Sequence, residues 1–483
     1  MDNASIMKID NVSVAEAIDE AKAALAKDKH ISSATRVAMT LLITLISILI
    51  GRLHLNSKNS SKPPSQDQNR EKKKRKKSGR SKGGQKGHVG LTLTPVADPD
   101  EVINLAIDRR TLPANGNYQA DGYTARQVVD IKISRQITEY RAENVVSKNG
   151  IQYTAKFPEN ITRPIQYGAS VKAHSVYLSI HQLIPYERLQ EQFNNEYSIP
   201  ISTGSICNFN AEAAAIVEEL FEPTVKQALA NAIVSHADET GANLDGKRIW
   251  LHNCSNETWT WIAPHTKRGQ EAMDDIGILP VFNGTLCHDH WKTYFNYGCD
   301  HQLCNAHHLR ELTFAYEENG QKWAKKMHNF LLNLNEEVNA TRKNKLSKKK
   351  KELRRAKYQS ILKKGNKECP AAISKDTGKI TVKQSKSRNL LERLQEHEDN
   401  VLRFMVESLV PFTNNQGERD IRMFKVQQKI SGCFRTMDGA VNFCKVRSYL
   451  STCAKNGVSA TEALELLFNR QMPDFVREQS AAS

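Results

Sequence analysis

Two apolar runs of strand character each end in an aspartate, and this pattern constrains the fold more than any other feature of the chain. The first run ends at Asp238 and the second, which passes through Cys287, ends at Asp289. A third carboxylate, Glu418, follows 129 positions later in a segment of helical character. Carboxylates on separate rigid elements suit a two-metal phosphoryl-transfer site, because Mg²⁺ and Mn²⁺ prefer oxygen ligands and are held about 4 Å apart. In a basic chain, this pattern favours the cutting or joining of nucleic acid.

The elements around these aspartates have an order typical of an α/β layer. Residues 232–238 predict a first strand, Arg248–Asn253 a second and Thr258–Ala263 a third, and a helix over about 269–278 leads to the strand that ends near Asp289. Sheets of this kind bind ligands beyond the ends of their strands. We therefore expect Asp238 and Asp289 on neighbouring strands.

The positive charge of the chain is concentrated in two segments. The 483 residues carry a net charge of +16, but residues 70–88 and 341–367 together carry +21, so the rest is slightly acidic. Local basicity favours binding of a polyanion by these segments, and the alternative is a solvated charge run. The candidate phosphate-contacting residues are Lys72, Lys73, Lys74, Arg75, Lys76, Lys77, Arg80, Lys82, Lys349, Lys350, Arg354, Arg419 and Arg422.

Composition favours a cytoplasmic protein associated with the nucleoid. The nine cysteines begin only at Cys207 and show no even framework, which is typical of reduced thiols in a cytosol. The apolar run at residues 37–50 would rise about 21 Å as a helix, which is short of the roughly 30 Å of a bilayer core. No membrane partner is expected, and residues 1–55 predict a helical hairpin or oligomerisation element.

Three further segments separate this hairpin from the α/β layer. The sequence of residues 56–90 predicts a basic linker. It is highly charged and contains many Asn, Ser, Pro and Gly residues, which favour turns and loops over a packed core. The alternation of Val129, Ile131 and Ile133 with polar residues predicts a small β-rich module over 91–170. Residues 171–229 predict a helix-turn-helix unit with Ser202 or Thr203 as a cap, and packing scaffold and DNA recognition are equally favoured roles for it.

Six motifs in order resemble the insertion-sequence-sixty-six family of DDE transposases over about residues 55–468. They are Asn59-Ser-Ser-Lys-Pro-Pro-Ser65, Gly83-Gly-Gln-Lys-Gly-His88, Asp238-Glu-Thr-Gly241, Cys304-Asn-Ala-His307, Asn414-Asn-Gln-Gly-Glu-Arg-Asp-Ile-Arg422 and Gly432-Cys-Phe-Arg-Thr436.

The resemblance implies a multidomain α/β plus α protein with an RNase H-like catalytic core. The core would comprise residues 230–315 and 401–483, with a basic helical insertion at 316–400. Asp238, Asp289 and Glu418 would hold two Mg²⁺ or Mn²⁺ ions, and His307 would lie close to the scissile phosphate. The implied reaction cuts the ends of the element and joins the freed 3′-OH to target DNA.

The resemblance also has consequences for partners and for zinc. The implied partner is double-stranded DNA, both element ends and target, bound by a homo-oligomer with or without accessory transposition proteins. Members of the family usually carry paired zinc-binding cysteines in the small β-rich module, but this chain has none before Cys207. A closed zinc site needs four ligands, so no structural zinc is expected there.

Alternatives remain open for several of these residues. Thr413 and Gly417 stand where the family commonly has Asp and Ala, which keeps open a catalytically inactive, DNA-binding relic. Glu418 and Arg422 have the i,i+4 spacing of a structural ion pair. Cys304 and His307 offer only two metal ligands, so a structural core pair and the family's signature beside the active site are weighed equally.

Overall fold

The computed structural model describes residues 8–9, 12–28, 30–53, 56, 58–60, 67, 93–114, 116–372 and 384–481. The chain divides into two compact units, one of residues 1–70 and 140–483 and the other of residues 71–139. Each unit is described by itself. The basic tract from Lys72 to Lys82, with its predicted phosphate contacts, lies outside the described residues.

Two helices near the N-terminus form the predicted hairpin. The short strands β1 (Lys8–Ile9) and β2 (Val12–Ser13) pair, and α1 (Val14–Lys27) packs against α2 (Ser33–Leu53). Many apolar side chains of α2 are exposed, including Leu41 at 61 %. None of the described helices combines the length and apolar character needed to cross a membrane.

The expected β-rich module is largely absent from the described residues. In the second unit only a short 3-10 turn, η1 (Arg109–Thr111), is regular, and the alternating Val129 and Ile133 belong to no strand. Residues 140–170 add one hairpin, β3 (Asn144–Val146) with β4 (Gln152–Thr154). Alternation stabilises a strand only where a partner pairs with it and another layer covers its apolar face. Ile131 has neither and is 82 % exposed.

A helical region precedes the large sheet and contains the predicted helix-turn-helix. Helix α4 ends at Ser198, which has a left-handed backbone (φ 53°), and α5 starts after Ser202, whose Oγ accepts the backbone N–H of Ser205 at 3.0 Å. The elements are α3 (Ala169–Val176), the π-helical turn η2 (Tyr177–His181), α4 (Tyr186–Tyr197), α5 (Thr203–Leu220) and α6 (Glu222–Ala230). Of the two predicted caps, the structure uses Ser202.

A mixed five-stranded sheet has the order β7-β6-β5-β8-β9. The pairs β5–β6 and β6–β7 are antiparallel, whereas β5–β8 and β8–β9 are parallel. The strands are β5 (Val234–Leu244), β6 (Lys247–Ser255), β7 (Thr260–His265), β8 (Thr285–His288) and β9 (Asp300–Leu303). Between β7 and β8 lie α7 (Gln270–Ile276) and a 3-10 turn, η3 (Leu279–Val281), and another, η4 (Lys292–Asn296), precedes β9. The predicted strands and the predicted helix are therefore present.

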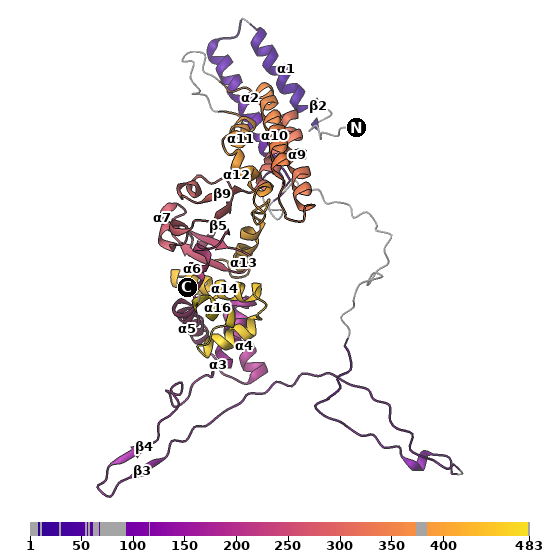
Figure 1. Cartoon of the computed structure of the whole chain (residues 1–483), viewed down its shortest axis with the longest axis vertical. Helices are drawn as coiled ribbons and strands as arrows, with labels where there is room; N and C mark the ends of the chain where they lie inside the picture. The colour runs from indigo at the N-terminus through magenta and orange to yellow at the C-terminus, as the bar shows by residue number, and fades with distance from the viewer. Residues whose placement is uncertain are drawn as a thin grey trace. The chain divides into compact units, whose positions relative to one another are not determined.

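Helices near the C-terminus pack against this sheet. Helix α13 (Asn415–Ser431) packs on β5 and β6, and α14 (Met437–Lys455) packs on β7. Figure 1 labels β5, α13 and α14. Strand β7 is an edge strand, and two of its N–H groups donate to hydroxyls of α14, Ile262 to Ser448 at 2.9 Å and Thr260 to Thr452 at 3.0 Å. The remaining helices are α15 (Ala460–Phe468) and α16 (Asp474–Ala481).

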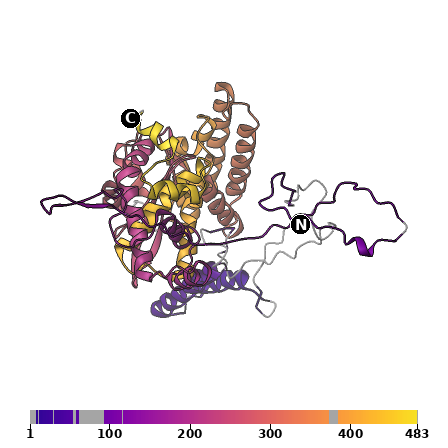
Figure 2. The ribbon, with the colours of Figure 1, turned by 90° about the horizontal axis from the view of Figure 1, so that it is seen from below.

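The helices that lie between β9 and α13 in the sequence form most of a second apolar core. Helices α9 and α10 lie side by side, drawn in orange-brown in Figure 2, and Trp323 and Tyr358 are fully buried in this core. Gly365 allows α10 to approach closely, since a Cβ there would lie 2.7 Å from Leu391. The elements are α8 (Asn305–Glu317), α9 (Lys322–Asn339), α10 (Lys348–Glu368), α11 (Lys386–Glu396), α12 (Glu398–Leu402) and η5 (Arg403–Met405).

Candidate active site

Asp238 lies on β5, and Asp289 directly follows β8, the parallel neighbour of β5. The register pairs Val234 with Thr285 and His236 with Cys287. Continuing this register by two residues brings Asp238 level with Asp289, which directly follows β8. Because adjacent strands are about 4.8 Å apart and side chains alternate with period two, both carboxylates belong to the same face.

The charge of Asp238 is poorly compensated. Burial, and after it the nearby carboxylates of Glu239, Asp289 and Glu418 in that order of effect, together raise the pKa of its carboxyl to about 8. Burial and Glu239 also raise the pKa of Asp289, against a lowering by the backbone N–H of Trp291, which donates to Asp289 Oδ1 at 2.8 Å. No ion pair joins either aspartate to a cation among the described residues.

Glu239, the neighbour of Asp238, is in contrast fully compensated. Its side chain is only 2 % exposed and forms a salt bridge with Arg268 at 2.5 Å. The hydroxyl of Tyr294 donates to its other carboxylate oxygen at 2.6 Å. The Arg268 guanidinium also lies over the rings of Trp250 and Trp291, at 4.8 and 4.5 Å from their centroids. Glu239 is therefore a structural carboxylate. The sequence does not reveal this, because Arg268 and Tyr294 are distant along the chain.

Hydrogen bonds of Asn414 hold the start of α13 against β5, the strand that carries Asp238. Its side-chain amide donates to the carbonyl of Ala237 at 2.7 Å, and its amide oxygen lies 2.7 Å from Nδ1 of buried His236. The backbone N–H of Asn414 donates to Cys304 Sγ at 3.1 Å. These bonds place Glu418, in the first turn of α13, beside the two strands.

The two departures from the family pattern leave this helix start intact. Gly417 is buried, its carbonyl accepts the Asn253 side-chain amide at 3.2 Å, and a Cβ on it would lie 3.2 Å from the Asn414 side chain. A larger residue at 417 would therefore press on the amide that holds α13 to β5. Nothing in the structure explains Thr413.

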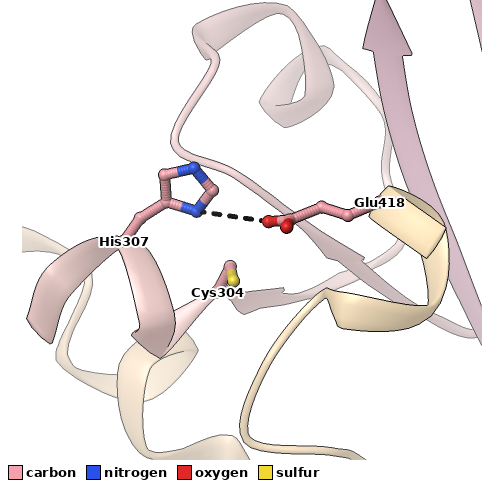
Figure 3. A group of neighbouring side chains, drawn as sticks. All are labelled: Cys304, His307 and Glu418. Carbon is pink, nitrogen blue, oxygen red and sulfur yellow. Dashed lines mark ion pairs between the residues drawn. The ribbon is translucent and has the colours of Figure 1, made fainter. Parts of the chain in front are cut away.

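The carboxylate of Glu418 points toward His307 and Cys304 (Figure 3). Glu418 Oε1 lies 4.0 Å from Nδ1 of His307. Within the described ranges, Cys304, His307 and Glu418 form the only group of three potential metal ligands whose atoms all lie within 4.8 Å of one another. Asp238 and Asp289 are not part of it. The alternative of a Glu418–Arg422 ion pair does not occur, since no salt bridge joins these two described residues.

His307 lies in a positively charged environment. Burial, and after it the charges of Arg310 and Arg393, together lower the pKa of its imidazole to about 4. The imidazole is therefore neutral near pH 7. The Nε atoms of Arg310 and Arg393 are buried and have no hydrogen-bond partner among the described residues. Sequence reasoning missed both arginines, because neither belongs to a charge run.

The predicted phosphate contacts within the described residues fall into two classes. Lys350 and Arg354 on α10 form salt bridges with Glu337 on α9, at 3.1 and 2.7 Å, so much of their charge is compensated within the fold. Lys349 on α10 and Arg419 and Arg422 on α13 are exposed. These three remain available to a polyanion.

Two family models match the chain. One, described as Transposase IS66 family, matches residues 164–442, a span that contains the sheet, the three carboxylates and the Cys304–His307 pair. The other, described as a family of unknown function (DUF6444), matches residues 15–93, which include α1 and α2. No curated protein matches the chain.

Proposed function

The chain belongs to the IS66 family of transposases, and from this premise we propose that it cuts the ends of an insertion sequence and joins the freed 3′-OH to target DNA. The reaction would be phosphoryl transfer assisted by two divalent ions. The observation that carries the proposal is the set of uncompensated carboxylates around Asp238.

The donor set fits hard divalent ions. Asp238 and Asp289 offer carboxylate oxygens from one face of the sheet, and Glu418 adds one from α13. Burial and, after it, repulsion by the neighbouring carboxylates raise the pKa of Asp238, and a divalent cation would stabilise the ionised carboxylate. When bound, Mg²⁺ or Mn²⁺ would supply the Lewis acidity that activates water and stabilises the leaving 3′-oxygen. Glu239 would have no ligand role, because Arg268 and Tyr294 already occupy its oxygens.

The order of the sheet is consistent with an RNase H-like core. Three antiparallel strands are followed by two parallel ones, and α13 returns to the central strands after the helices of residues 316–400. On this view residues 230–315 and 401–483 form the core, and the helices between them are an insertion. The arrangement supports a site to which the two strands and α13 each contribute one carboxylate.

Several cationic groups would bind the DNA backbone. The unpartnered Nε–H groups of Arg310 and Arg393 lie near His307 and need acceptors, which a scissile phosphate would provide, while Nη2 of Arg393 is already paired with Glu311. Exposed Lys349, Arg419 and Arg422 would contact flanking phosphates, together with the tract Lys72 to Lys82. His307 would hold a neutral imidazole beside the phosphate.

A strand-transfer assay tests the proposal. The purified chain is mixed with DNA that carries the ends of its own element and a supercoiled target, with and without Mg²⁺ or Mn²⁺. We expect metal-dependent 3′-end cleavage and joining, and loss of both in Asp289→Asn. DNA binding by the wild type without any metal-dependent nicking would instead support the catalytically inactive relic.

A further inference from the structure

We propose that Cys304, His307 and Glu418 form a second metal site, selective for Zn²⁺ and similar transition ions. Cys304 precedes α8, His307 lies in the first turn of that helix, and Glu418 comes from the first turn of α13. In Figure 3 the imidazole and the carboxylate point toward each other, with the sulfur beside the space between them. All three ligand atoms lie within 4.8 Å of one another.

The two polar groups that face each other lack partners. His307 Nδ1 and Glu418 Oε1 are both buried, and neither has a hydrogen-bond partner among the described residues. Their separation of 4.0 Å is too long for a hydrogen bond. Burying such atoms without partners is costly, so the arrangement favours a ligand between them.

The neighbouring residue shows that this is not a general property of the helix start. His308, in the same turn of α8, is completely buried, yet its Nδ1 lies 3.0 Å from the side-chain oxygen of Asn305. The fold thus gives His308 a hydrogen-bond partner, Asn305, within the same turn. The ring nitrogen of His307 instead faces a carboxylate and a thiol.

The chemistry of the donors selects the ion. Sulfur, imidazole nitrogen and carboxylate oxygen together suit Zn²⁺ rather than Mg²⁺. Zn²⁺ with bonds of about 2.0–2.3 Å holds its tetrahedral ligands roughly 3.3–3.8 Å apart, so small side-chain rotations would close this site. The N–H of Asn414, which donates to Cys304 Sγ, would stabilise the thiolate. Three protein ligands leave the fourth position open.

This site differs from the zinc site considered from the sequence. The expectation of no structural zinc concerned the cysteine-free residues 91–206, and the sequence alone supplied only two ligands at Cys304 and His307. The fold adds the third by bringing α13 against α8 through Asn414.

Binding of an ion at this second site does not depend on the proposed function. Its consequence does rest on that function: the ion would regulate the transposition reaction. Glu418 is a candidate ligand of both sites, so ions at the two sites would compete for its carboxylate. A transition ion at Cys304 and His307 would hold Glu418 away from Asp238 and Asp289, and the chain would be inhibited by Zn²⁺ at constant Mg²⁺.

Binding is tested with the full-length protein and Co²⁺ alone, because tetrahedral cobalt gives visible bands and a thiolate charge-transfer band. We expect one equivalent with a thiolate band in the wild type and in Cys207→Ser, which removes an exposed cysteine. Cys304→Ser should lose the band, and His307→Gln should weaken binding by at least about tenfold. Absence of the band in the wild type, or its persistence in Cys304→Ser, would overturn the site.

Two measurements separate this inference from the proposed function. Asp238→Asn should keep the Co²⁺ spectrum while losing strand transfer, because Asp238 is no ligand of the second site. Circular dichroism melts show which variants fold, and if Cys304→Ser does not fold, the weakened Co²⁺ binding expected of His307→Gln is the test of the site. Strand transfer without a cobalt spectrum would reject the site alone, and a cobalt spectrum without strand transfer would reject the proposed function alone.

Discussion

Glu239 and Arg268 form a buried ion pair one residue away from Asp238, which has no such partner. Two adjacent carboxylates on β5 therefore have opposite electrostatic roles. The Glu239 carboxylate holds the loop after β7 against the sheet through Arg268. The Asp238 carboxylate is repelled by its neighbours and gains from a bound cation.

Asp238→Asn should increase the stability of the metal-free protein while abolishing activity. The substitution removes a buried carboxyl whose ionisation is disfavoured by burial and by the carboxylates of Glu239, Asp289 and Glu418. In EDTA we expect stabilisation by about 1–3 kcal/mol, since each unit of pKa shift corresponds to about 1.4 kcal/mol. Cleavage should fall at least about 100-fold with Mg²⁺. Melting curves and the strand-transfer assay measure both effects, and a destabilised variant in EDTA would contradict the assigned repulsion.

Glu239→Gln should lower the stability of the protein, whereas Asp238→Asn should raise it. It leaves the Arg268 charge without its partner and weakens the bond from Tyr294, and we expect a loss of about 1–3 kcal/mol because Arg268 is partly exposed. Urea unfolding measures the loss. Glu271→Gln, on the exposed start of α7, is the matched control and should stay within about 0.5 kcal/mol of the wild type. Equal stabilities for all three proteins would show that the ion pair is not structural.

The buried His252 should make the protein less stable in acid. Burial lowers the pKa of its imidazole to about 4, helped by the charges of His265 and Arg268, whereas the hydrogen bond with the Lys267 carbonyl opposes this. The unfolded chain therefore takes up a proton that the folded chain does not, and stability falls as the pH drops from about 6.5 to about 4.

The contribution of this one group is up to about 3 kcal/mol. His252→Gln should flatten the fall in unfolding free energy over that pH range, although other buried histidines keep part of it. His30→Gln, at an exposed position between α1 and α2, is the control. An unchanged slope in His252→Gln, measured by urea unfolding at several pH values, would contradict the assignment.

The sequence predicts the sheet better than the site. The strands that lead to Asp238 and Asp289 follow from local apolar runs, and their parallel pairing brings the two aspartates level as expected. The direction of the Glu418 carboxylate cannot be predicted locally, because Cys304 and His307, which it faces, lie more than 100 residues earlier in the chain.

Other contacts are equally non-local. The charge run predicts a phosphate contact for Lys350, and the fold adds a salt bridge from Lys350 to Glu337 on α9 that the sequence does not reveal. The alternation at Ile131 predicts a strand that the described chain does not form, because no partner strand pairs with it. Periodicity reports which faces could be buried, and only the fold determines which of them are.

Neutralising Lys72 to Lys77 with glutamine should weaken DNA binding nearly equally for all sequences. Each phosphate contact contributes about −0.9 to the slope of log affinity against log salt, so six lost contacts would reduce the slope by up to about 5. Filter binding at several salt concentrations measures this slope. Lys350→Gln is the comparison, and it should change the slope less because Glu337 already pairs with Lys350. Loss of sequence discrimination at an unchanged slope would mean that the tract reads bases.

Deleting residues 1–55 should lower the oligomeric state of the protein. Val37, Leu41, Leu45 and Leu49 lie four residues apart on α2 and are 69 %, 61 %, 49 % and 57 % exposed, which forms an apolar stripe along the helix. Apolar stripes of this kind mark surfaces that associate with other chains. Light scattering after size exclusion measures the mass of the full and shortened chains.

A charge within the stripe is a milder test of the same surface. Leu45→Lys should dissociate the assembly as the deletion does, because a lysine there would be buried between helices without a partner. Thr40→Lys adds the same charge at an exposed position on the other side of α2 and should leave the mass unchanged. If the full-length chain is monomeric at micromolar concentration, or if both lysine variants keep the wild-type mass, α2 is not the element that holds the copies together.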